Sequence, residues 1–363
     1  MKDSILFILH LPPPVHGAAT IGKYIRDSEL INSEFDCHFV NLTTAGHLDD
    51  VGKFKIWKLV SFCHLIRNII QSVKRYKPNL VYMTPNAKGG PFYKDSIVMT
   101  LLKFMDCKIV VHYHNKGVIT HQDRGFDNLL YKRFFKGIKV ILLSDRLYAD
   151  ISKYVVSKDV YICPNGIPYN QDIKKGKHNE VPRILFLSNL LIEKGILVLL
   201  DAMKILKDQG CAFTCDIVGN ETADIDLNRL DKEIHVRELN NIVVPHGGKY
   251  GKEKQHFYED ADMFVFPTLN ECFPLVLLEA MQHSLPIVTT DEGGIPDIVQ
   301  DGENGLICKK NDADDLANKL SSLLNDKSSR EKMGMDGFEK FKDNFTLDIF
   351  EKRMADILHR LLP

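Results

Sequence analysis

Residues 263–280 read Met-Phe-Val-Phe-Pro-Thr-Leu-Asn-Glu-Cys-Phe-Pro-Leu-Val-Leu-Leu-Glu-Ala, and this stretch decides the fold. Its first four residues are apolar and predict a buried strand at 263–266. A short loop holding Glu271 follows, and a helix is expected to begin near Pro274, because proline suits the first helical position. Strand, loop and helix in this order form the repeating unit of a parallel sheet wrapped by helices.

The start of this helix predicts an anion site. Its first N–H groups lack partners within the helix, and together with the helix dipole they suit a diphosphate. Glu271, just before the helix, is placed to bind sugar hydroxyls, and Glu279 is placed to accept both hydroxyls of a ribose. The alternative is an ordinary helix that carries one exposed and one buried glutamate.

The same alternation of strand and helix extends over most of the chain. It predicts an α/β fold with two Rossmann-like, doubly wound domains that face each other across a cleft. Residues 1–170 are expected to form the first domain and residues 171–342 the second, joined by the polar segment 169–182, with a final helix at 343–363. Strands are expected at 4–9, 37–42, 79–84, 108–113 and 138–143, and then at 183–188, 214–218, 242–245, 263–266 and 285–290.

Composition sets limits on the class of protein. The 363 residues carry a net charge of -1, which conceals a split: residues 1–172 have 23 Lys+Arg and 15 Asp+Glu (+8), and residues 173–363 have 24 and 33 (-9). The eight cysteines lack metal-ligand spacing, so we interpret them as reduced thiols, mostly in the core. No apolar run is long enough to span a membrane. The absence of a G-x-G-x-x-G after the first strand disfavours a nicotinamide dehydrogenase.

Several motifs together resemble the family-four retaining glycosyltransferases, which have the GT-B fold. Glu271 and Glu279 match the E-x7-E signature of that family, and Glu193-Lys194-Gly195 matches its E-K-G. Further matches, in family order, lie at residues 11–18, 110–115, 163–167, 291–299 and 301–305. The resemblance implies an acceptor-binding first domain, a second domain that binds a nucleotide diphosphate sugar, and a final helix that crosses back to the first domain.

The resemblance also implies roles for individual residues. His114, Glu271 and Lys194 are the expected catalytic residues, with Lys194 stabilising charge on the departing diphosphate and the other two orienting the sugar. The expected acceptor-binding residues are His16, His112 and Asn115. The expected donor-binding residues are Gly17, Asn189, Lys194, His246, Glu271, Cys272, Phe273, Pro274, Leu275 and Glu279. We expect no cofactor and no metal requirement, since Asp224-Ile-Asp226 and Asp260-Ala-Asp262 stand outside the expected site.

The chain departs from the family pattern at Asn189. The family has arginine there, in G-R-L-x-x-x-K-G, whereas this chain has Ser188-Asn189-Leu190-Leu191-Ile192-Glu193-Lys194-Gly195. Asparagine lacks the charge and the bidentate fork of arginine, so Lys194 is left with more of the charge neutralisation. Lys249 is a candidate for the missing cation.

Residues 53–77 predict a basic amphipathic helix. The segment holds seven basic residues and no acidic one, and Ile56, Leu59, Val60, Cys63, Ile66, Ile70 and Val73 recur at helical spacing. We expect this stripe to pack on the sheet and the charged rim to contact anionic lipid headgroups. The expected protein is therefore cytoplasmic and peripheral on the inner face of the cell membrane, with no nucleic-acid partner. Its partners would be a nucleotide-sugar donor and a glycan, lipid-linked or small-molecule acceptor.

The expected function is transfer of a hexose-type sugar in the assembly of cell-surface polysaccharide. Two alternatives remain open at this level. A GT-B nucleotide-sugar epimerase or phosphorylase would give a different product from a labelled donor. A non-catalytic sugar-binding protein of the same fold would neither hydrolyse nor transfer the donor sugar.

Overall fold

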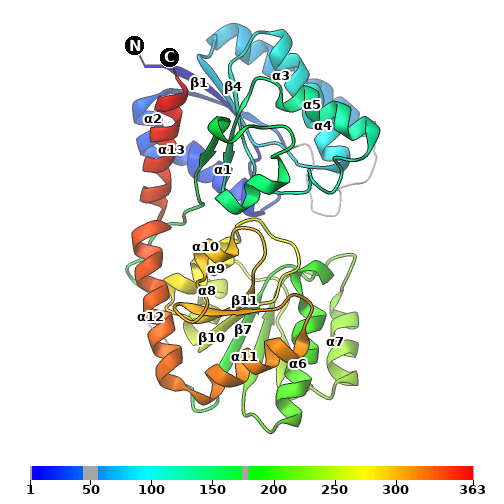
Figure 1. The fold of residues 1–363 in the computed structure, drawn as a ribbon, viewed down its shortest axis with the longest axis vertical. Helices are drawn as coiled ribbons and strands as arrows, with labels where there is room; N and C mark the ends of the chain where they lie inside the picture. The colour runs from blue at the N-terminus through cyan, green and yellow to red at the C-terminus, as the bar shows by residue number, and fades with distance from the viewer. Residues whose placement is uncertain (1, 44–55, 174–178, 363) are drawn as a thin grey trace. The chain divides into compact units, whose positions relative to one another are not determined.

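A computed structural model describes residues 2–43, 56–173 and 179–362. The chain divides into two compact units: Met1–Asn165 with Leu347–Pro363, and Gly166–Thr346. Each unit contains a six-stranded parallel sheet flanked by helices, which confirms the predicted fold class (Figure 1). The expected domain boundaries at 170 and 342 differ from these divisions by five and four residues.

The first sheet has the strand order β2-β1-β3-β4-β5-β6. All of its neighbouring strands run parallel, so every strand ends at the same edge of the sheet. β1, β3 and β4 are almost continuously buried and apolar, as expected for strands covered on both faces. The strands are β1 (Ser4–Leu9), β2 (Asp36–Asn41), β3 (Leu80–Met83), β4 (Ile109–His112), β5 (Lys139–Leu142) and β6 (Val160–Ile162). Sequence patterns missed β6, which has only three residues, all of them half-buried.

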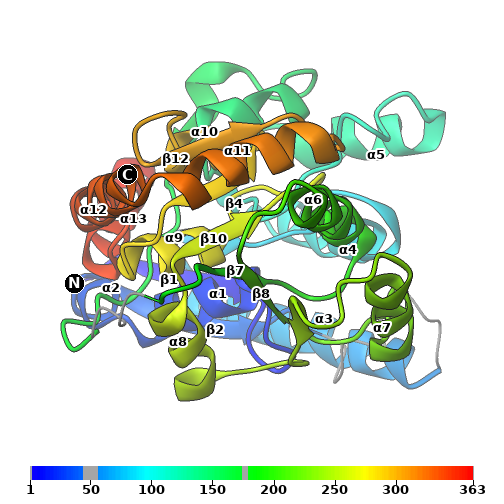
Figure 2. The same ribbon diagram turned by 90° about the horizontal axis from the view of Figure 1, so that it is seen from below.

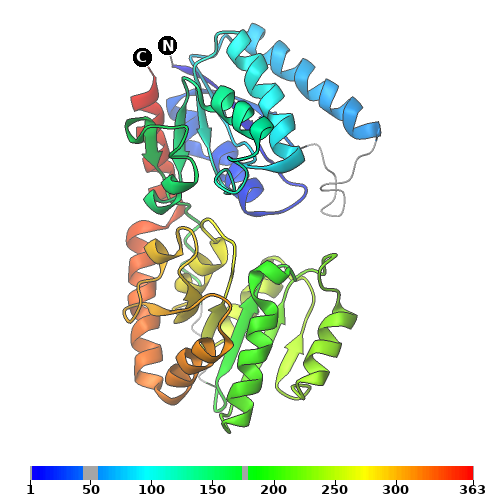
Figure 3. The same ribbon diagram turned by 45° about the vertical axis from the view of Figure 1, so that its right-hand side comes forward.

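The helices of the first unit cover both faces of this sheet. α4 and α5 lie side by side, as Figures 1 and 3 show, and the final helix α13 packs on α2. His359 of α13 contacts Glu34 at 2.8 Å, and its ring lies 4.6 Å from the ring of Phe35. The helices are α1 (Gly17–Asp27), α2 (Glu29–Glu34), α3 (Ile56–Tyr76), α4 (Gly89–Phe104), α5 (Gly125–Phe135) and α13 (Leu347–Leu361), with 3-10 turns η2 (Asp145–Asp150) and η3 (Ser157–Asp159).

α3 is rotated relative to the expected packing. The residues of its described part that enter the core are Leu65, Ile69 and Val73, which recur every fourth residue. Among the stripe residues whose side chains are described, Val73 is buried, Ile66 and Ile70 are half-buried, Cys63 is exposed and Val60 is 54% exposed. The predicted stripe was therefore wrong, because two apolar stripes compete on this helix and the sheet selects the one ending at Val73. Lys53, Phe54 and Lys55 lie outside the described residues, and so do the side chains of residues 56–59.

The second sheet has the order β12-β11-β10-β7-β8-β9, again all parallel. Its strands are β7 (Arg183–Leu187), β8 (Thr214–Val218), β9 (Val243–Pro245), β10 (Met263–Phe266), β11 (Ile287–Thr290) and β12 (Gly305–Cys308). β12 was not predicted. Two of its four residues are only half-buried, and it is the edge strand beside β11, so its sequence lacks the apolar run of the central strands.

Helices cover the second sheet on both faces. Figures 1 and 2 show α6 and α11 side by side on one face and α8 and α9 on the other. Aspartates cap several of these helices; Asp226, for example, accepts a hydrogen bond from the N–H of Arg229 at the start of α7. The elements are η4 (Ile192–Lys194), α6 (Ile196–Asp208), α7 (Leu227–Val236), α8 (Gly251–Asp260), α9 (Leu275–Gln282), α10 (Ile295–Ile298), α11 (Ala313–Asn325) and α12 (Lys327–Asn344).

The cysteines are less uniformly buried than expected. All eight are free thiols, but only Cys163, Cys215, Cys272 and Cys308 are buried, and Cys63 is exposed. Among the described residues, no helix combines the length and the apolarity needed to cross a bilayer.

Candidate functional site

Lys194 and Glu271 meet at the edge where the strands of the second sheet end. Lys194 follows β7 and Glu271 follows β10, two strands that are neighbours in the sheet. The Lys194 Nζ lies 2.7 Å from Glu271 Oε1 and donates to the carbonyl of Asn270 at 2.9 Å. Both side chains are only partly exposed, at 14% and 20%. Two of the predicted catalytic residues therefore form one ion pair that solvent still reaches.

The two loops that carry this pair are bonded to each other. The N–H of Leu269 donates to the carbonyl of Glu193 at 2.8 Å, and the amide of Asn270 donates to the Glu193 carboxylate at 3.0 Å. Gly195, the C-cap of η4, has a φ of +80°, and a Cβ there would collide with the backbone carbonyl of Pro267. Only glycine adopts this positive φ readily and has no Cβ to collide with the carbonyl. The Glu193-Lys194-Gly195 motif therefore fixes Lys194 against the Glu271 loop.

A second glycine supports Glu271 from the other side. Gly293 follows β11 and has a φ of +57°, and a Cβ on it would collide with the backbone carbonyl oxygens of Glu271 and Cys272. The next N–H, that of Gly294, donates to the carbonyl of Cys272 at 2.7 Å. The Glu271 loop is thus held between two loops that each need glycine for close approach.

α9 begins at Leu275, one position after the expected start, and Pro274 is its N-cap with an extended backbone. The side chains of Cys272 and Phe273 are buried, so any donor contact from these two residues must come from the backbone. Proline has no N–H. The N–H groups of Leu275 and Val276 belong to the first turn, where a helix offers no internal acceptor. This short helix therefore presents donors beside the Lys194–Glu271 pair.

Glu279 lies farther along α9 and contacts two residues of α8. Its Oε1 accepts from Lys254 Nζ at 2.6 Å and its Oε2 accepts from the Tyr258 hydroxyl at 2.8 Å. Burial, followed by the neighbouring Glu279 carboxylate, raises the pKa of Tyr258 well above its usual range, so this phenol remains a hydrogen-bond donor. A carboxylate offers about four lone pairs, and these two contacts leave capacity for a diol. Sequence analysis missed Lys254 and Tyr258, whose one signal is their i, i+4 spacing on one helix face.

Asn189 belongs to a polar group on the neighbouring loops. Its Oδ1 accepts from the Asn220 amide at 3.1 Å, and the same amide donates to the Tyr250 hydroxyl at 2.5 Å. Lys249, the cation considered as a replacement for arginine, lies 3.8 Å from Glu253. Lys254, and not Lys249, contacts Glu279, the residue predicted to bind the ribose.

His246 follows β9 and contacts Asp216 of β8. Its Nε2 lies 2.6 Å from Asp216 Oδ1, and Arg183 lies 3.4 Å from the other oxygen of the same carboxylate. The ring of Phe257 lies 4.6 Å from the imidazole. His246 is thus held in place by its neighbours while 27% of its side chain stays exposed.

In the two D-x-D sequences, Asp224, Asp226 and Asp262 accept hydrogen bonds from backbone N–H groups. Asp226 caps α7, and Asp262 accepts from the N–H of Arg183 at 2.8 Å. Asp224 accepts from the N–H of Ile192 at 3.4 Å. Within residues 2–43, 56–173 and 179–362, no three His, Cys, Asp or Glu side chains are arranged as a metal site.

The first unit brings four histidines together where its strands end. The rings of His112 and His114 lie 4.2 Å apart, as the i, i+2 spacing predicts, and those of His10 and His16 lie 5.9 Å apart. Burial, together with the positive charge available on neighbouring groups, lowers the pKa of His10 to about 3. Burial also lowers the pKa of His114 to about 3, with a smaller contribution from His16. These rings are therefore neutral at pH 7.

His112 and His114 differ in their surroundings. The His112 ring has no exposed surface, and its Nδ1 lies 2.6 Å from the Tyr82 hydroxyl. Neither ring nitrogen of His114 has a hydrogen-bond partner in the described part of the chain. A neutral imidazole offers one donor and one acceptor, so His114 has unused hydrogen-bonding capacity, as has Nε2 of His112.

The other predicted residues of the first unit lie nearby. His16 is the N-cap of α1 and accepts from the N–H of Ala19 at 3.4 Å. Gly17 is exposed, and a Cβ there would meet nothing within 4 Å, so packing within the unit does not require glycine at this position. The Asn115 amide is engaged at both ends, accepting from the N–H of Ala87 at 2.6 Å and donating to the carbonyl of Pro85 at 3.4 Å. Sequence analysis missed His10, which lies one residue beyond β1.

Residues 169–340, which lie within the second unit, match the family model described as glycosyl transferases group 1. The chain is a glycosyltransferase. This glycosyltransferase is 25% identical over 289 residues to the capsular polysaccharide biosynthesis glycosyltransferase CapM of Staphylococcus aureus, over 74% of this chain and 75% of CapM. It is 27% identical over 271 residues to the amylovoran biosynthesis glycosyltransferase AmsK of Erwinia amylovora, over 72% of this chain and 66% of AmsK.

The fold of the glycosyltransferase matches a solved structure along its full length. Anabaena Alr3699/HepE, solved in complex with UDP and glucose, aligns with a TM-score of 0.74 and 15% identity, over 99% of this chain and 100% of that one. At this identity the similarity concerns the fold, which is that of the GT-B glycosyltransferases.

Proposed function

We propose that this glycosyltransferase transfers a hexose-type sugar from a nucleotide diphosphate to a glycan acceptor with retention of anomeric configuration. The observation that carries the proposal is the grouping of Lys194, Glu271 and the first turn of α9 at one edge of the second sheet, with Glu279 farther along the same helix. The spacing of Glu271 and Glu279 resembles the E-x7-E signature of the family-four enzymes, and Lys194 pairs with the first of these glutamates.

In the proposed reaction, Lys194 and the N–H groups of Leu275 and Val276 bind the diphosphate and stabilise the charge it gains on leaving. The bond from the anomeric carbon to the diphosphate breaks while the bond to the acceptor oxygen forms on the same face. The acceptor proton passes to the departing diphosphate. Glu271 and the neutral His114 orient the sugar hydroxyls, so most of the catalysis comes from positioning and charge stabilisation.

The donor is proposed to be a nucleoside diphosphate sugar, with Glu279 accepting from the ribose hydroxyls. The HepE complex with UDP and glucose makes uridine diphosphate sugars the first donors to test. The names of CapM and AmsK favour an acceptor in cell-surface polysaccharide assembly. Acceptors of that class are often lipid-linked, so we also propose peripheral contact with the inner face of a membrane.

The test begins with a thermal-shift panel of nucleoside diphosphates and nucleotide sugars, because a ligand stabilises the folded state according to its affinity. The best donor is then used in a labelled form, and the anomeric configuration of the product is read by NMR. Retention supports the proposal, whereas inversion contradicts it. An epimerised free sugar, or a product formed only with phosphate, would identify one of the alternative GT-B activities.

We predict turnover without added divalent metal, since Lys194 and the helix N–H groups neutralise the diphosphate. The measurement is the rate after exhaustive chelation, with a mock-treated sample as the control. Complete loss of activity that manganese or magnesium restores would show that a cation shares this neutralisation.

A further inference from the structure

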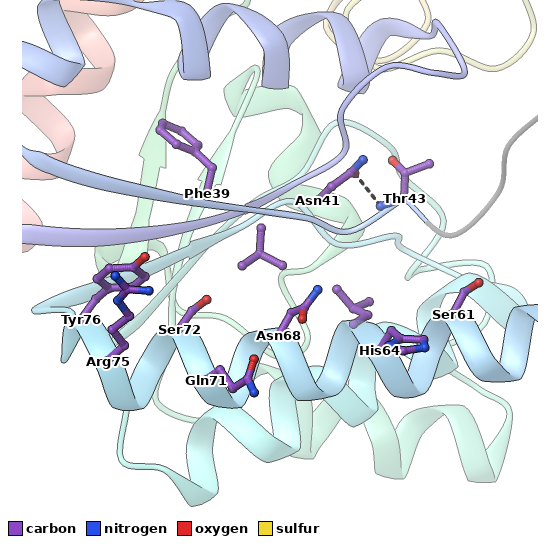
Figure 4. A pocket seen from close by; sticks show the side chains of 12 residues that line it. Phe39, Asn41, Thr43, Ser61, His64, Asn68, Gln71, Ser72, Arg75 and Tyr76 are labelled. Carbon is purple, nitrogen blue, oxygen red and sulfur yellow. Dashed lines mark hydrogen bonds between the residues drawn. The ribbon is translucent and has the colours of Figure 1, made fainter.

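The first unit contains a long groove between the edge strand β2 and helix α3, which we name the β2–α3 groove (Figure 4). Its volume is about 510 Å³, within the range of small-ligand sites. Phe39, Asn41 and Thr43 line it from β2 and the residues just after it, and Ser61, His64 and Asn68 are among those lining it from α3. Both walls belong to one compact unit.

The groove is lined mainly by neutral polar side chains. In α3, Ser61, His64, Asn68 and Ser72 form a stripe along the side facing β2, and Gln71 lies beside it. Hydroxyl and amide groups both donate and accept hydrogen bonds, which suits a ligand rich in hydroxyl groups. The lining contains no carboxylate.

One end of the groove has a cation and stacked rings. Arg75 lies over the Tyr76 ring at 5.3 Å, and the His38 ring stacks on Tyr76 at 3.6 Å. Asp36 contacts His38 at 3.1 Å. Arg75 thus stands as the single charge of the lining, and it favours a ligand that carries a carboxylate or a phosphate.

The other end of the groove joins the candidate acceptor site. The Thr43 hydroxyl lies 3.5 Å from His10 Nδ1 and donates to the carbonyl of Leu11 at 3.3 Å. His10 belongs to the same histidine group as His16 and His114. From Ser61 to Arg75 the helix rises by about 21 Å, at 1.5 Å per residue, so the groove has the length of several linked sugar rings.

We propose that the β2–α3 groove binds the upstream sugars of an anionic oligosaccharide acceptor, whose reactive end lies at the histidine group. This inference rests on the proposed function and specifies its acceptor as a growing, acidic chain in place of a single sugar. Asn68 and Gln71 bind hydroxyl groups along the chain, and Arg75 binds a carboxylate or phosphate several residues from the reactive end.

The test measures direct binding to the full chain by calorimetry. The probes are oligogalacturonides of increasing length, with maltooligosaccharides of the same lengths as uncharged controls. We expect affinity for the acidic series to rise with length until the groove is filled and to exceed that for the neutral series. No binding of either series, or equal binding of both, would overturn the proposal.

Variants locate the binding. Asn68→Ala combined with Gln71→Ala should weaken binding of the longer acidic probes by about 10-fold, since each variant side chain no longer forms its hydrogen bond to the probe. Arg75→Gln should weaken them by about 5-fold, a value discounted for its exposure. Lys74→Gln is the matched control, because Lys74 is exposed on the same turn of α3 and does not line the groove. Equal losses from Lys74→Gln and Arg75→Gln would show attraction to the basic helix alone and would overturn the groove assignment.

Two further measurements separate this inference from others. Nucleoside diphosphate binding is recorded for each variant: if nucleotides bind and oligogalacturonides do not, the groove inference fails alone, and if neither binds, the proposed function fails as well. Anionic vesicles provide the second measurement. Vesicle binding that Arg75→Gln and Lys74→Gln weaken alike, without any oligosaccharide binding, would assign this face to lipid and overturn the proposal.

Discussion

Glu279 accepts hydrogen bonds from Lys254 and Tyr258, and these contacts set the behaviour of its variants. Glu279→Gln should weaken nucleoside diphosphate binding by roughly 10- to 150-fold, the equivalent of one charged hydrogen bond worth about 1.5–3 kcal/mol. Glu271→Gln should mainly lower kcat, since Glu271 is proposed to orient the sugar. Calorimetry with nucleoside diphosphates and steady-state kinetics with the donor sugar separate the two effects.

The matched control for this pair is Glu253→Gln on α8, an exposed glutamate 3.8 Å from Lys249. It removes a similar charge from the same unit and should leave both measurements unchanged. Wild-type affinity and kcat in correctly folded Glu279→Gln and Glu271→Gln proteins would refute the assignment of both glutamates.

At the scale of the element, the Glu271 loop depends on close approach of backbones. Gly293→Ala should lower both turnover and thermal stability, because its positive φ is strained for alanine and its Cβ would push against the carbonyls of Glu271 and Cys272. Gly302→Ala is the control, since Gly302 has a φ of +80° but open space at its Cβ position. Both variants share the backbone strain, so only the collision distinguishes them.

The measurement for this pair is kcat with the preferred donor beside the melting temperature. Gly302→Ala should lose stability while keeping the turnover of the folded protein. If the two variants lose turnover equally, the packing of the Gly293 loop does not position Glu271.

Helix α3 supports a prediction about membranes. In its described part, Val60 and Cys63 are exposed and Arg67 and Lys74 are exposed basic residues. Co-sedimentation should increase with the anionic lipid content of vesicles and fall as salt is raised. Replacing Lys53, Lys55 and Lys58 together with glutamine should weaken binding by roughly 100-fold, at about 1 kcal/mol for each basic residue near the surface.

The control for the vesicle experiment replaces three exposed lysines of the second unit, Lys252, Lys309 and Lys327, with glutamine. This variant has the same net charge as the first one. If the wild-type protein does not bind anionic vesicles at low salt, or if both triple variants lose binding equally, a membrane role for the basic segment 53–58 is ruled out.

At the scale of the whole molecule, the histidine group of the first unit makes stability depend on pH. The pKa of His10 and that of His114 are each about 3 in the folded protein, against about 6.5 in an unfolded chain. Between these values the unfolded chain binds protons that the folded chain does not. The free energy of unfolding should therefore fall as pH falls below 6.5, by about 1.4 kcal/mol per pH unit for each histidine.

Denaturant unfolding between pH 7.5 and 5.5 measures this slope while most carboxylates stay ionised. His114→Gln should make the slope shallower, whereas His256→Gln, which changes an imidazole that is 71% exposed, should leave it unchanged. An identical slope in the wild type and His114→Gln would mean that His114 accepts a proton without opening the fold.

The sequence by itself determined the features that are local along the chain. The strand, loop and helix around Glu271 and the turn at Gly195 follow from residue types at fixed spacing, and so does the strand that places His112 and His114 on one side. The parallel pairing of the strands then brings the loop of Lys194 beside the loop of Glu271, because strands of the same direction end at one edge. The fold class and the placing of Lys194 and Glu271 at one edge of a sheet were therefore within reach of the sequence, whereas their ion pair was not predicted.

Only the tertiary structure decided which partners reach these residues from other elements. Lys254 meets Glu279 because α8 and α9 cover the same face of the second sheet, and His10 joins His114 across 104 positions of chain. α3 buries Leu65 and Ile69 in place of the stripe that its periodicity favoured, and this rotation leaves a polar groove beside β2. Periodicity describes one element at a time, whereas the side of a helix that is buried depends on the shape of the surface it packs against.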